Sequence, residues 1–325
     1  MRTQGLQFEE FGKPHEVLNL VDYETGDLSG NEVLVEMLAS PINPSDLGTI
    51  GGSYGMLPEL PAFGGLEGVG KVVEKGPSVA DVEVGDHVRL PADKGTWSRH
   101  LVCSSDKLER IPNHLHVEQA AMSTVNPMTA ELLLEKLAAK GDWFIQNAAN
   151  SAVGIALIQI AKARNISSVN LVRREELIEP LKALGAEHVF VDNDESVQQI
   201  RELTKDLGSP SHAFNSVGGE SAYRMAKSLR NGGQHITYGA MTGEKVRFPT
   251  RYLIFNDISF SGFWVTRWKK EVPASVSEEY QQRIYQYIEN GTLKLPVEQT
   301  YQLSELKEAL AHNARPRLGK ILFVT

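Results

Sequence analysis

The sequence has a single cysteine, Cys103, in 325 residues. One cysteine excludes a disulfide within the chain and any metal site built from cysteines alone. The chain also lacks an apolar run of the roughly 18 residues that a membrane helix needs. Its first residues, 1–8, alternate like a strand and show neither the apolar core of a signal peptide nor the character of a transit peptide. We therefore expect a cytoplasmic protein with no membrane partner.

The chain has fewer basic residues than acidic ones. It has 33 Lys and Arg against 41 Asp and Glu, a formal net charge of −8. An acidic balance argues against general binding to nucleic acid or to anionic membranes. The hydrophobic share of 41% is ordinary for a globular protein, and the length is sufficient for two domains.

The pattern of predicted secondary structure divides the chain into two parts. Up to about residue 110, short strand-like segments alternate with Gly, Pro and Asp, which predicts a β-rich, partly barrel-like lobe. From about residue 118, strands alternate with helices, and the expected strands are 142–146, 168–172, 188–191, 211–215, 234–238 and 258–262. This alternation specifies right-handed crossovers and a parallel, doubly wound α/β sheet. We expect a Rossmann dinucleotide-binding domain over 118–262, with 1–117 and 263–325 forming the first lobe.

The turn after the first of these strands is the expected pyrophosphate loop. It runs Ala149-Asn150-Ser151-Ala152-Val153-Gly154, with only the last glycine of the dinucleotide fingerprint. Its small side chains allow a close approach, Asn150 and Ser151 can donate hydrogen bonds, and the following apolar helix offers free N–H groups to an anion. The alternative is a turn without a ligand, but six alternating strands favour nucleotide binding.

The second strand is followed by Arg173-Arg174, where an NAD site would place an acidic residue for the ribose hydroxyl. A guanidinium suits a 2′-phosphate through charge-assisted hydrogen bonds, which favours NADPH. Glu175 and Glu176 follow directly, so a helix start with mixed charges is the alternative.

Motifs spread along the whole chain are similar to those of a known protein family. They are "SPINPSDLGTIGGSYG" (40–55), "VNPMTA" (125–130), "IQNAANSAVG" (145–154), "LVRREE" (171–176), "TYGAM" (237–241) and "SGFWVTRWKK" (261–270). With them the chain resembles the zinc-free branch of the medium-chain dehydrogenase/reductase superfamily. Within that branch it is most similar to the NADPH-dependent 2-enoyl thioester reductases of the mitochondrial type.

The resemblance implies a GroES-like catalytic domain joined to the Rossmann domain, and roles for individual residues. The catalytic tyrosine of the family corresponds to Tyr54, twelve residues after Ile42. The implied cofactor contacts are Asn126, Asn150, Ser151, Ala152, Val153, Arg173, Arg174, Glu175, Tyr238, Gly239, Ala240, Met241, Phe263, Trp264, Val265 and Lys320. Two departures from the family pattern, Ala152 for a glycine and Arg174-Glu175 for Asp-Arg, bear on cofactor affinity.

No metal site is expected. Zinc-bearing relatives use Cys and His ligands, with Gly-His-Glu in the second ligand motif. This chain has Pro-Ile-Asn-Pro (41–44) at the first ligand position and Leu66, before Glu67, at the second. A leucine has no atom that can bind zinc. The histidines, such as His87, His100 and His235, are scattered, and we interpret them as structural.

The implied reaction is reduction of trans-2-enoyl thioesters, with hydride added to Cβ and a proton from Tyr54. A tyrosine, whose usual pKa is about 10, can donate a proton at neutral pH. The acyl group would be a thioester of coenzyme A or of an acyl-carrier protein. Phe263, Trp264 and Trp268 could line an acyl pocket or be core residues. The cations 267, 269 and 270 could meet phosphates, but a solvated turn is the preferred interpretation.

Two other functions stay open at this point. One is a zinc-free NADPH:quinone oxidoreductase, in which Tyr54 would be incidental. The other is an NADPH-binding protein without turnover. Because relatives commonly pair through the edge strands of the nucleotide domain, we expect a homodimer.

Overall fold

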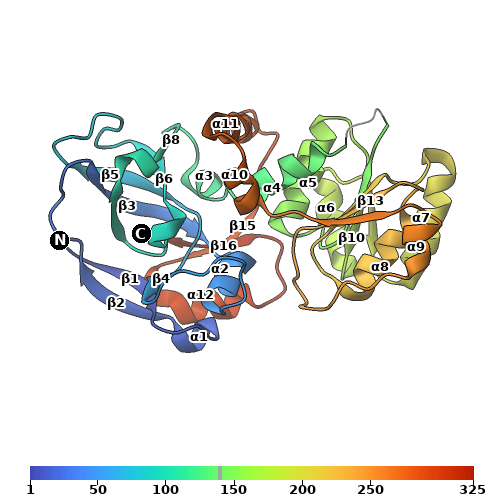
Figure 1. The fold of residues 1–325 in the computed structure, drawn as a ribbon, viewed down its shortest axis with the longest axis horizontal. Coiled ribbons are helices and arrows are strands. Elements are labelled where there is room, and N and C mark those ends of the chain that lie inside the picture. Colours follow the sequence, from blue (N-terminus) through green and yellow to red (C-terminus); the bar gives the residue numbers. More distant parts are fainter. Residues whose placement is uncertain (138–140) are drawn as a thin grey trace. The chain divides into compact units, whose positions relative to one another are not determined.

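The computed structural model describes residues 1–137 and 141–325 (Figure 1). The chain divides into two compact units: unit 1 comprises Met1–Thr124 and Leu295–Thr325, and unit 2 comprises Val125–Lys294. Unit 1 is β-rich and unit 2 holds a parallel sheet, so the predicted α/β fold class is confirmed. Among the described residues, no helix combines the length and the hydropathy required to cross a membrane.

Unit 1 is built mainly from antiparallel strands. Its strands are β1 (Arg2–Phe8), β2 (Asn19–Glu24), β3 (Glu32–Pro41), β4 (Ala62–Phe63), β5 (Val69–Lys75), β6 (His87–Arg89), β7 (His100–Ser104), β8 (Glu109–Ile111), β15 (Val297–Tyr301) and β16 (Lys320–Val324). Its helices are α1 (Pro14–Val17), α2 (Pro44–Ile50), α3 (Val117–Ala121) and α12 (Leu306–Asn313), with short 3-10 turns η1 (Ala92–Lys94), η2 (Ser105–Lys107) and η4 (Leu303–Glu305). The larger sheet has the order β15-β16-β3-β5-β6-β8 with β7 also on β3, and the smaller sheet has the order β2-β1-β4.

The core of unit 1 lies against β3. Val33, Val35 and Met37 alternate along this strand and are fully buried, as period-two spacing on a half-covered sheet requires. The C-terminal strand β16 pairs antiparallel with β3, and its Phe323 packs edge-on against Trp97 with ring centroids 5.2 Å apart. The end of the chain therefore returns to the first lobe, as predicted.

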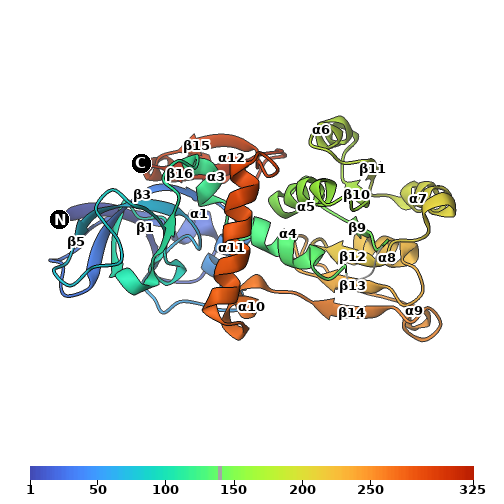
Figure 2. The same ribbon diagram turned by 90° about the horizontal axis from the view of Figure 1, so that it is seen from above.

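Unit 2 holds six parallel strands in the order β11-β10-β9-β12-β13-β14, which Figure 2 shows in succession. They are β9 (Phe144–Gln146), β10 (Ser168–Val172), β11 (His188–Val191), β12 (His212–Asn215), β13 (Gln234–Thr237) and β14 (Ser259–Gly262). The helices are α4 (Asn126–Leu134), α5 (Ala152–Ala163), α6 (Ile178–Ala183), α7 (Asp194–Leu207), α8 (Gly219–Ser228), α9 (Thr250–Ile254), α10 (Val265–Glu271) and α11 (Ala274–Glu289), with a 3-10 turn η3 (Glu175–Leu177). Crossovers of this kind are right-handed, so α5 and α6 cover one face of the sheet and α7 and α8 the other.

The predicted strands of unit 2 agree closely with the observed ones. The strands at 168–172 and 188–191 have the predicted bounds, and the other four begin or end one or two residues away. The start of α7 lies at Asp194, directly after Asn193. Asn193 accounts for it, because its Oδ1 accepts a hydrogen bond from the Ser196 N–H at 3.0 Å and caps the helix.

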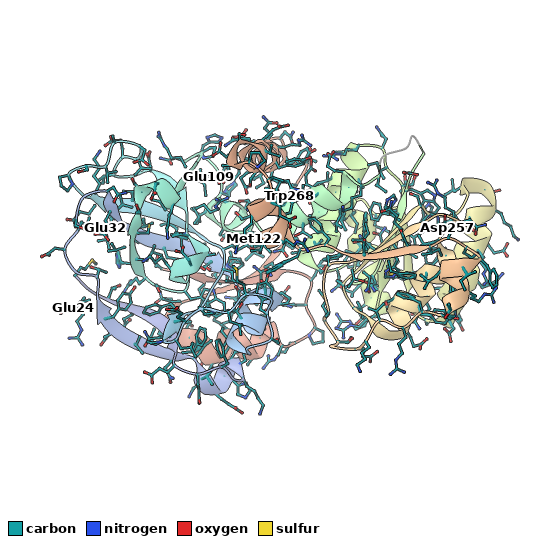
Figure 3. All side chains as sticks on the ribbon, in the orientation of Figure 1. Glu24, Glu32, Glu109, Met122, Asp257 and Trp268 are labelled. Atoms are coloured by element: carbon teal, nitrogen blue, oxygen red, sulfur yellow. The ribbon has the colours of Figure 1, made fainter. Side chains whose placement is uncertain are left out.

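Unit 2 extends further than expected, to Lys294 rather than residue 262. The added helices pack on α4. Val265 of α10 lies in a cluster with Met128 and Leu132, and Trp268, labelled in Figure 3, packs on the same cluster. An ionic network also holds α11, because the fully buried Glu131 accepts hydrogen bonds from Arg164 and Arg283. Residues 263–294, which the sequence placed with the first lobe, therefore belong to unit 2.

Candidate functional site

The first candidate site is the carboxyl edge of the parallel sheet in unit 2. Strand order reverses between β9 and β12, so the chain leaves these neighbouring strands toward opposite faces. Open α/β sheets bind their ligands in the crevice at such a switch point. The turns 147–151, after β9, and 216–218, after β12, form its two sides.

Buried amides tie the two turns together. Asn147 Nδ2 donates to Asn215 Oδ1 and to Ser221 Oγ, each at 2.8 Å, and the Ser216 N–H donates to Asn147 Oδ1 at 2.8 Å. Asn215 Oδ1 also accepts from the Gly218 N–H at 3.1 Å. Sequence reasoning did not identify this network. The available signal was an asparagine at or just after the end of each of two buried strands.

The loop expected to hold the pyrophosphate has the geometry of a dinucleotide cradle. Ser151 caps α5, accepting a hydrogen bond from the Gly154 N–H at 3.1 Å. A Cβ on Gly154 would lie 2.5 Å from the Ala149 carbonyl oxygen, so only glycine lets the helix start so close to the loop. Asn150, Ala152 and the other predicted loop residues are contiguous in this turn and helix start, whose N–H groups suit an anion. These residues fit a bound dinucleotide.

Tyr238 follows β13 at the same edge of the sheet. Burial raises the pKa of Tyr238 to about 12, and the nearby Ser216 and Ser151 hydroxyls oppose that rise. The phenol is therefore a protonated donor at neutral pH. The Met241 N–H donates to the Ser216 carbonyl at 2.8 Å, so segment 238–241, with Gly239 and Ala240, runs beside the turn that follows β12.

Arg173 and Arg174 directly follow β10 but differ in their surroundings. Arg174 Nε lies 3.0 Å from the Glu176 carboxylate, so its charge is paired within the chain. Arg173 is exposed, as is Glu175. Of the two guanidiniums, Arg173 is the better placed for an incoming phosphate.

The remaining residues predicted to contact the cofactor in unit 2 lie at helix starts. Asn126 is the first residue of α4 and is buried. Phe263 and Val265 pack into the cluster around α4, and Trp264 is half-buried at the start of α10. On the same helix, Arg267 pairs with Glu271 at 2.6 Å.

The second candidate site lies in unit 1, where Tyr54 follows α2. We call residues 51–55 the Tyr54 loop. The N–H groups of Ser53 and Tyr54 both donate to the Gly48 carbonyl, at 2.9 Å and 3.1 Å. Gly52 has a φ of 73°, a left-handed conformation that allows this tight return. The half-buried Tyr54 ring is thus presented from the end of α2.

At the start of α2 lies a buried cluster that sequence reasoning missed. It consists of Asn43, Asp46, Glu67 and Lys320. Asn43 Nδ2 donates to Glu67 Oε1 at 2.7 Å, and Lys320 Nζ donates to Asn43 Oδ1 and, at 2.8 Å, to the Ile42 carbonyl. Burial raises the pKa of Asp46 to about 7 and lowers the pKa of Lys320 to about 8. That Lys320 contacts the cofactor stays a prediction, because the contacts found for it lie within unit 1.

The residues at the positions of the zinc ligands do not fit a metal. Leu66 offers no donor atom, and the Asn43 amide is engaged with Glu67 and Lys320. Across residues 1–137 and 141–325, no three His, Cys, Asp or Glu side chains are grouped so that they could hold an ion. Cys103 is buried, which raises its pKa to about 12 and leaves it an inert thiol.

A β-rich unit joined to a doubly wound unit with a dinucleotide crevice defines a medium-chain dehydrogenase/reductase. The comparisons agree: residues 29–113 match the family model "Alcohol dehydrogenase GroES-like domain", and residues 152–282 match "Zinc-binding dehydrogenase". The enoyl-[acyl-carrier-protein] reductase of Xenopus tropicalis mitochondria is 40% identical, over 98% of this chain and 94% of that protein. Its Homo sapiens counterpart is 38% identical, over 100% of this chain and 89% of that protein. The chain belongs to the enoyl-[acyl-carrier-protein] reductase family.

Solved structures agree over the whole chain. The complex of Etr1p with NADP and crotonyl-CoA has a TM-score of 0.91 and 32% identity, covering 100% of both chains. The Etr1p/Etr2p heterodimer, a mitochondrial 2-enoyl thioester reductase from Candida tropicalis, also has a TM-score of 0.91, with 31% identity and 100% coverage of both. A putative NADPH:quinone reductase from Bacillus thuringiensis has the same TM-score at 30% identity, covering 100% of this chain and 99% of that one.

The prediction of a cytoplasmic protein is wrong by these comparisons. The curated relatives from Xenopus tropicalis, Homo sapiens and Arabidopsis thaliana are named as mitochondrial enzymes. The prediction depended on the first residues and on a lone cysteine. A free thiol is compatible with any reducing compartment, so a lone cysteine does not indicate which compartment holds the protein.

Proposed function

We propose that this protein is an NADPH-dependent reductase of trans-2-enoyl thioesters, with Tyr54 as the proton donor and without a catalytic metal. The observation that carries the proposal is the full-length similarity to Etr1p, a protein known in complex with NADP and crotonyl-CoA. The dinucleotide cradle in unit 2 and the presented tyrosine in unit 1 support it. A mitochondrial location is proposed from the names of the relatives.

Reduction of the double bond requires a hydride at Cβ and a proton at Cα. NADPH supplies the hydride when it is bound. The Tyr54 hydroxyl donates the proton to Cα and regains one from solvent. Charge that develops on the thioester oxygen during the reaction needs a hydrogen-bond donor or dipole aimed at it.

The cofactor is held by the chain's own donors. The α5 start and the side chains of Asn150 and Ser151 take the pyrophosphate, and Arg173 takes the 2′-phosphate through charge-assisted hydrogen bonds. Asn126 is assigned to the nicotinamide half. Segments 238–241 and 263–265 are assigned to further contacts with the cofactor. Ala152 and Val153 contribute backbone N–H groups and little bulk.

A metal is not needed in this scheme. Zinc serves to polarise a carbonyl or an alcohol, whereas here a tyrosine supplies the proton. Leu66 and the internally bonded Asn43 leave no ligand set for it. We therefore expect dialysis against a chelator to leave turnover unchanged.

The substrate is proposed to be a thioester of coenzyme A or of an acyl-carrier protein.

The assembly is proposed to be a homodimer. β14 is the edge strand of the sheet, and Leu253, Ile254 and Phe255, which precede it in sequence, are 48%, 65% and 76% exposed. An unpaired edge flanked by exposed apolar side chains suits pairing with a second copy. Light scattering on the wild type and on Phe255→Asp would test this, with a monomeric wild type contradicting it.

The test of function compares two substrate classes on one preparation. NADPH oxidation is followed with crotonyl-CoA, with longer enoyl thioesters and with quinones. Turnover of thioesters at a kcat/KM well above that of quinones supports the proposal.

Quinone reduction is the second candidate, favoured by the similarity to the Bacillus thuringiensis structure. Turnover of quinones with none of the thioesters would establish it and would overturn the first proposal. Tight NADPH binding with no turnover of either class would instead indicate a binding protein.

A further inference from the structure

A buried glutamine at the end of β9 is not explained by packing. Gln146 is fully buried and follows the apolar residues Phe144 and Ile145 in a strand that pairs with β10 on one side and β12 on the other. Its side-chain Oε1 has no hydrogen-bond partner among the described residues. A buried oxygen without a partner lowers stability, so an apolar side chain would suit the sheet better. Gln146 therefore calls for a role in addition to stability.

The side-chain amide of Gln146 joins the sheet to α5. Its Nε2 donates to the Gly154 carbonyl at 3.0 Å and to Asn170 Oδ1 at 2.7 Å. Asn170 Nδ2 in turn donates to the His188 carbonyl at 3.1 Å and to Ser168 Oγ at 3.0 Å. Because a carbonyl oxygen only accepts, the Gly154 and His188 carbonyls fix the orientation of both amides. The amides thus connect β11, β10 and β9 in succession and end on α5.

Gly154 is the residue on which the geometry of the pyrophosphate loop depends. The Ser151 hydroxyl caps its N–H at 3.1 Å, and the Gln146 amide holds its carbonyl. A Cβ at this position would lie 2.5 Å from the Ala149 carbonyl oxygen, so the helix starts in close contact with the loop. The peptide groups on the two sides of Gly154 are therefore held separately, one by the loop and the other by the sheet. Together these contacts set where the free N–H groups of the first turn of α5 lie.

The residue that follows Gln146 acts on the opposite face of the sheet. Successive residues of an extended chain point to opposite faces, and Asn147 bonds to Ser221 of α8, whereas Gln146 bonds to Gly154 of α5. The turn after β9 is thus tied to one helix on each face. Of the two amides, it is Gln146 that holds the helix whose start is proposed to bind the pyrophosphate.

We propose that Gln146 is a positioning residue for the cofactor: its amide holds the first turn of α5 against β9, in the place where the free N–H groups meet the pyrophosphate of NADPH. The inference rests on the proposed contact between this turn and the pyrophosphate. It concerns a residue that acts through the helix, because the Gln146 side chain is fully buried and its Nε2 is engaged within the chain. It predicts a loss of affinity confined to ligands that carry the pyrophosphate.

Removing the amide releases one side of Gly154. Gln146→Met keeps the length of the side chain but has no donor for the Gly154 carbonyl. The first turn of α5 is then held by the Ser151 cap and by packing alone, and its N–H groups lose their fixed place. Asn170 keeps its bonds to Ser168 and His188, so β10 stays in register with β11. The 2′-phosphate, which is proposed to bind after β10, therefore keeps its contact.

The test measures the binding of two ligands to wild type, to Gln146→Met and, as a matched control, to Gln198→Met. Gln198 is an exposed glutamine of the same unit whose amide bonds to Glu202 at 2.9 Å on α7. NADPH carries the pyrophosphate, whereas 2′-AMP carries the 2′-phosphate without it. Calorimetry should show a Kd for NADPH raised about tenfold in Gln146→Met, the loss of roughly one charge-assisted hydrogen bond, with the Kd for 2′-AMP within about twofold of wild type. The control should match wild type for both ligands.

Three outcomes would overturn the inference. The first is an unchanged Kd for NADPH in Gln146→Met. The second is an equal loss for NADPH and 2′-AMP, which would indicate a general loosening of unit 2. The third is an equally large effect of Gln198→Met.

A second variant decides the matter if Gln146→Met does not fold. Gln146→Asn keeps a buried amide, but its side chain is shorter and does not reach the Gly154 carbonyl. A folded Gln146→Asn that binds NADPH more weakly and 2′-AMP normally supports the inference. A variant that is unfolded, unaffected or weakened for both ligands contradicts it.

Binding to the wild type separates this inference from the proposed function. If wild type does not bind NADPH, the cofactor site fails and the inference fails with it. If wild type binds NADPH but reduces no enoyl thioester, the proposed reaction fails, and the difference between NADPH and 2′-AMP still decides the role of Gln146. If wild type binds NADPH but not 2′-AMP, the proposed contact of Arg173 fails, and an unchanged Kd for NADPH in Gln146→Met contradicts the inference.

Discussion

The two candidate sites bury polar groups of different kinds. At the carboxyl edge of the sheet in unit 2, the buried groups are neutral amides and hydroxyls, led by Asn147 and Asn215. At the start of α2 in unit 1, the buried groups Asp46, Glu67 and Lys320 are charged. Neutral dipoles can receive an anionic cofactor without opposing charge of their own, whereas a charged cluster must balance itself. The difference separates an edge that can receive an anionic cofactor from a cluster whose charges are balanced within the chain.

The largest expected effect comes from removing the Tyr54 hydroxyl in unit 1. Tyr54→Phe deletes only the phenolic oxygen, so kcat for crotonyl-CoA should fall by about 10²–10⁴-fold, the usual contribution of a general acid. The KM for NADPH should stay within twofold, because the cofactor cradle belongs to unit 2. Steady-state kinetics checks both numbers. An unchanged kcat would remove Tyr54 from the reaction.

Acidic pH should lower the stability of unit 2, because it favours protonation of His235. This fully buried residue of β13 packs against Phe248 and Phe260, and burial lowers its pKa to about 4 from an ordinary 6.5. Between these values the unfolded chain binds more protons, so stability is lost as pH falls from 6.5 to 4. The loss should reach about 3 kcal/mol.

Urea unfolding at several pH values checks this, with His235→Leu as the comparison. The variant has no imidazole to protonate, so its stability should vary less across the same window. Parallel pH profiles for the two proteins would show that His235 is not the responsible group.

Breaking the amide network should cost less. Asn147→Leu leaves the Ser216 N–H without its acceptor and removes the hydrogen bonds to Ser221 Oγ and Asn215 Oδ1, which should lower the unfolding free energy by about 2 kcal/mol. Asn256→Leu is a control, because it removes an exposed amide that bonds to Asn231. Equal losses in the two variants, measured by urea unfolding, would argue against a special role for the buried network.

The smallest expected effect concerns cofactor choice. Arg173→Ala should raise the KM for NADPH about tenfold, the effect of one charge-assisted contact, and should leave the KM for NADH unchanged. Arg174→Ala should change it less, because Arg174 is paired with Glu176. If Arg174→Ala has the larger effect, the assignment of the two arginines must be reversed.

The parallel sheet was predictable because its signals are local. Buried strands such as Ser168–Val172 are short, largely apolar runs, and their length and the turn residues on both sides distinguish them from helices. The pyrophosphate loop was predicted in the same way, from its place between a strand and an apolar helix. Tyr54 required the resemblance, because a tyrosine in a glycine-rich turn carries no signal of its own.

The charged cluster and the end of unit 2 were not predictable from local pattern. Lys320 and Ile42 are 278 positions apart in sequence, and only the pairing of β16 with β3 brings them together. Likewise, α11 belongs to unit 2 because Arg283 reaches Glu131 on α4, a contact across 152 positions. Contacts of this range depend on tertiary structure, which composition and periodicity do not encode.

Isotope transfer into the product of crotonyl-CoA reduction tests the proposed chemistry most directly. The wild-type protein is run once with NADPH deuterated at the transferable position in H₂O, and once with ordinary NADPH in D₂O, and butyryl-CoA is analysed by mass spectrometry and NMR. We predict deuterium at Cβ from the cofactor and at Cα from the solvent, by way of the exchangeable Tyr54 hydroxyl. No butyryl-CoA, or cofactor deuterium at any carbon other than Cβ, would contradict the assignment of this protein as an enoyl thioester reductase.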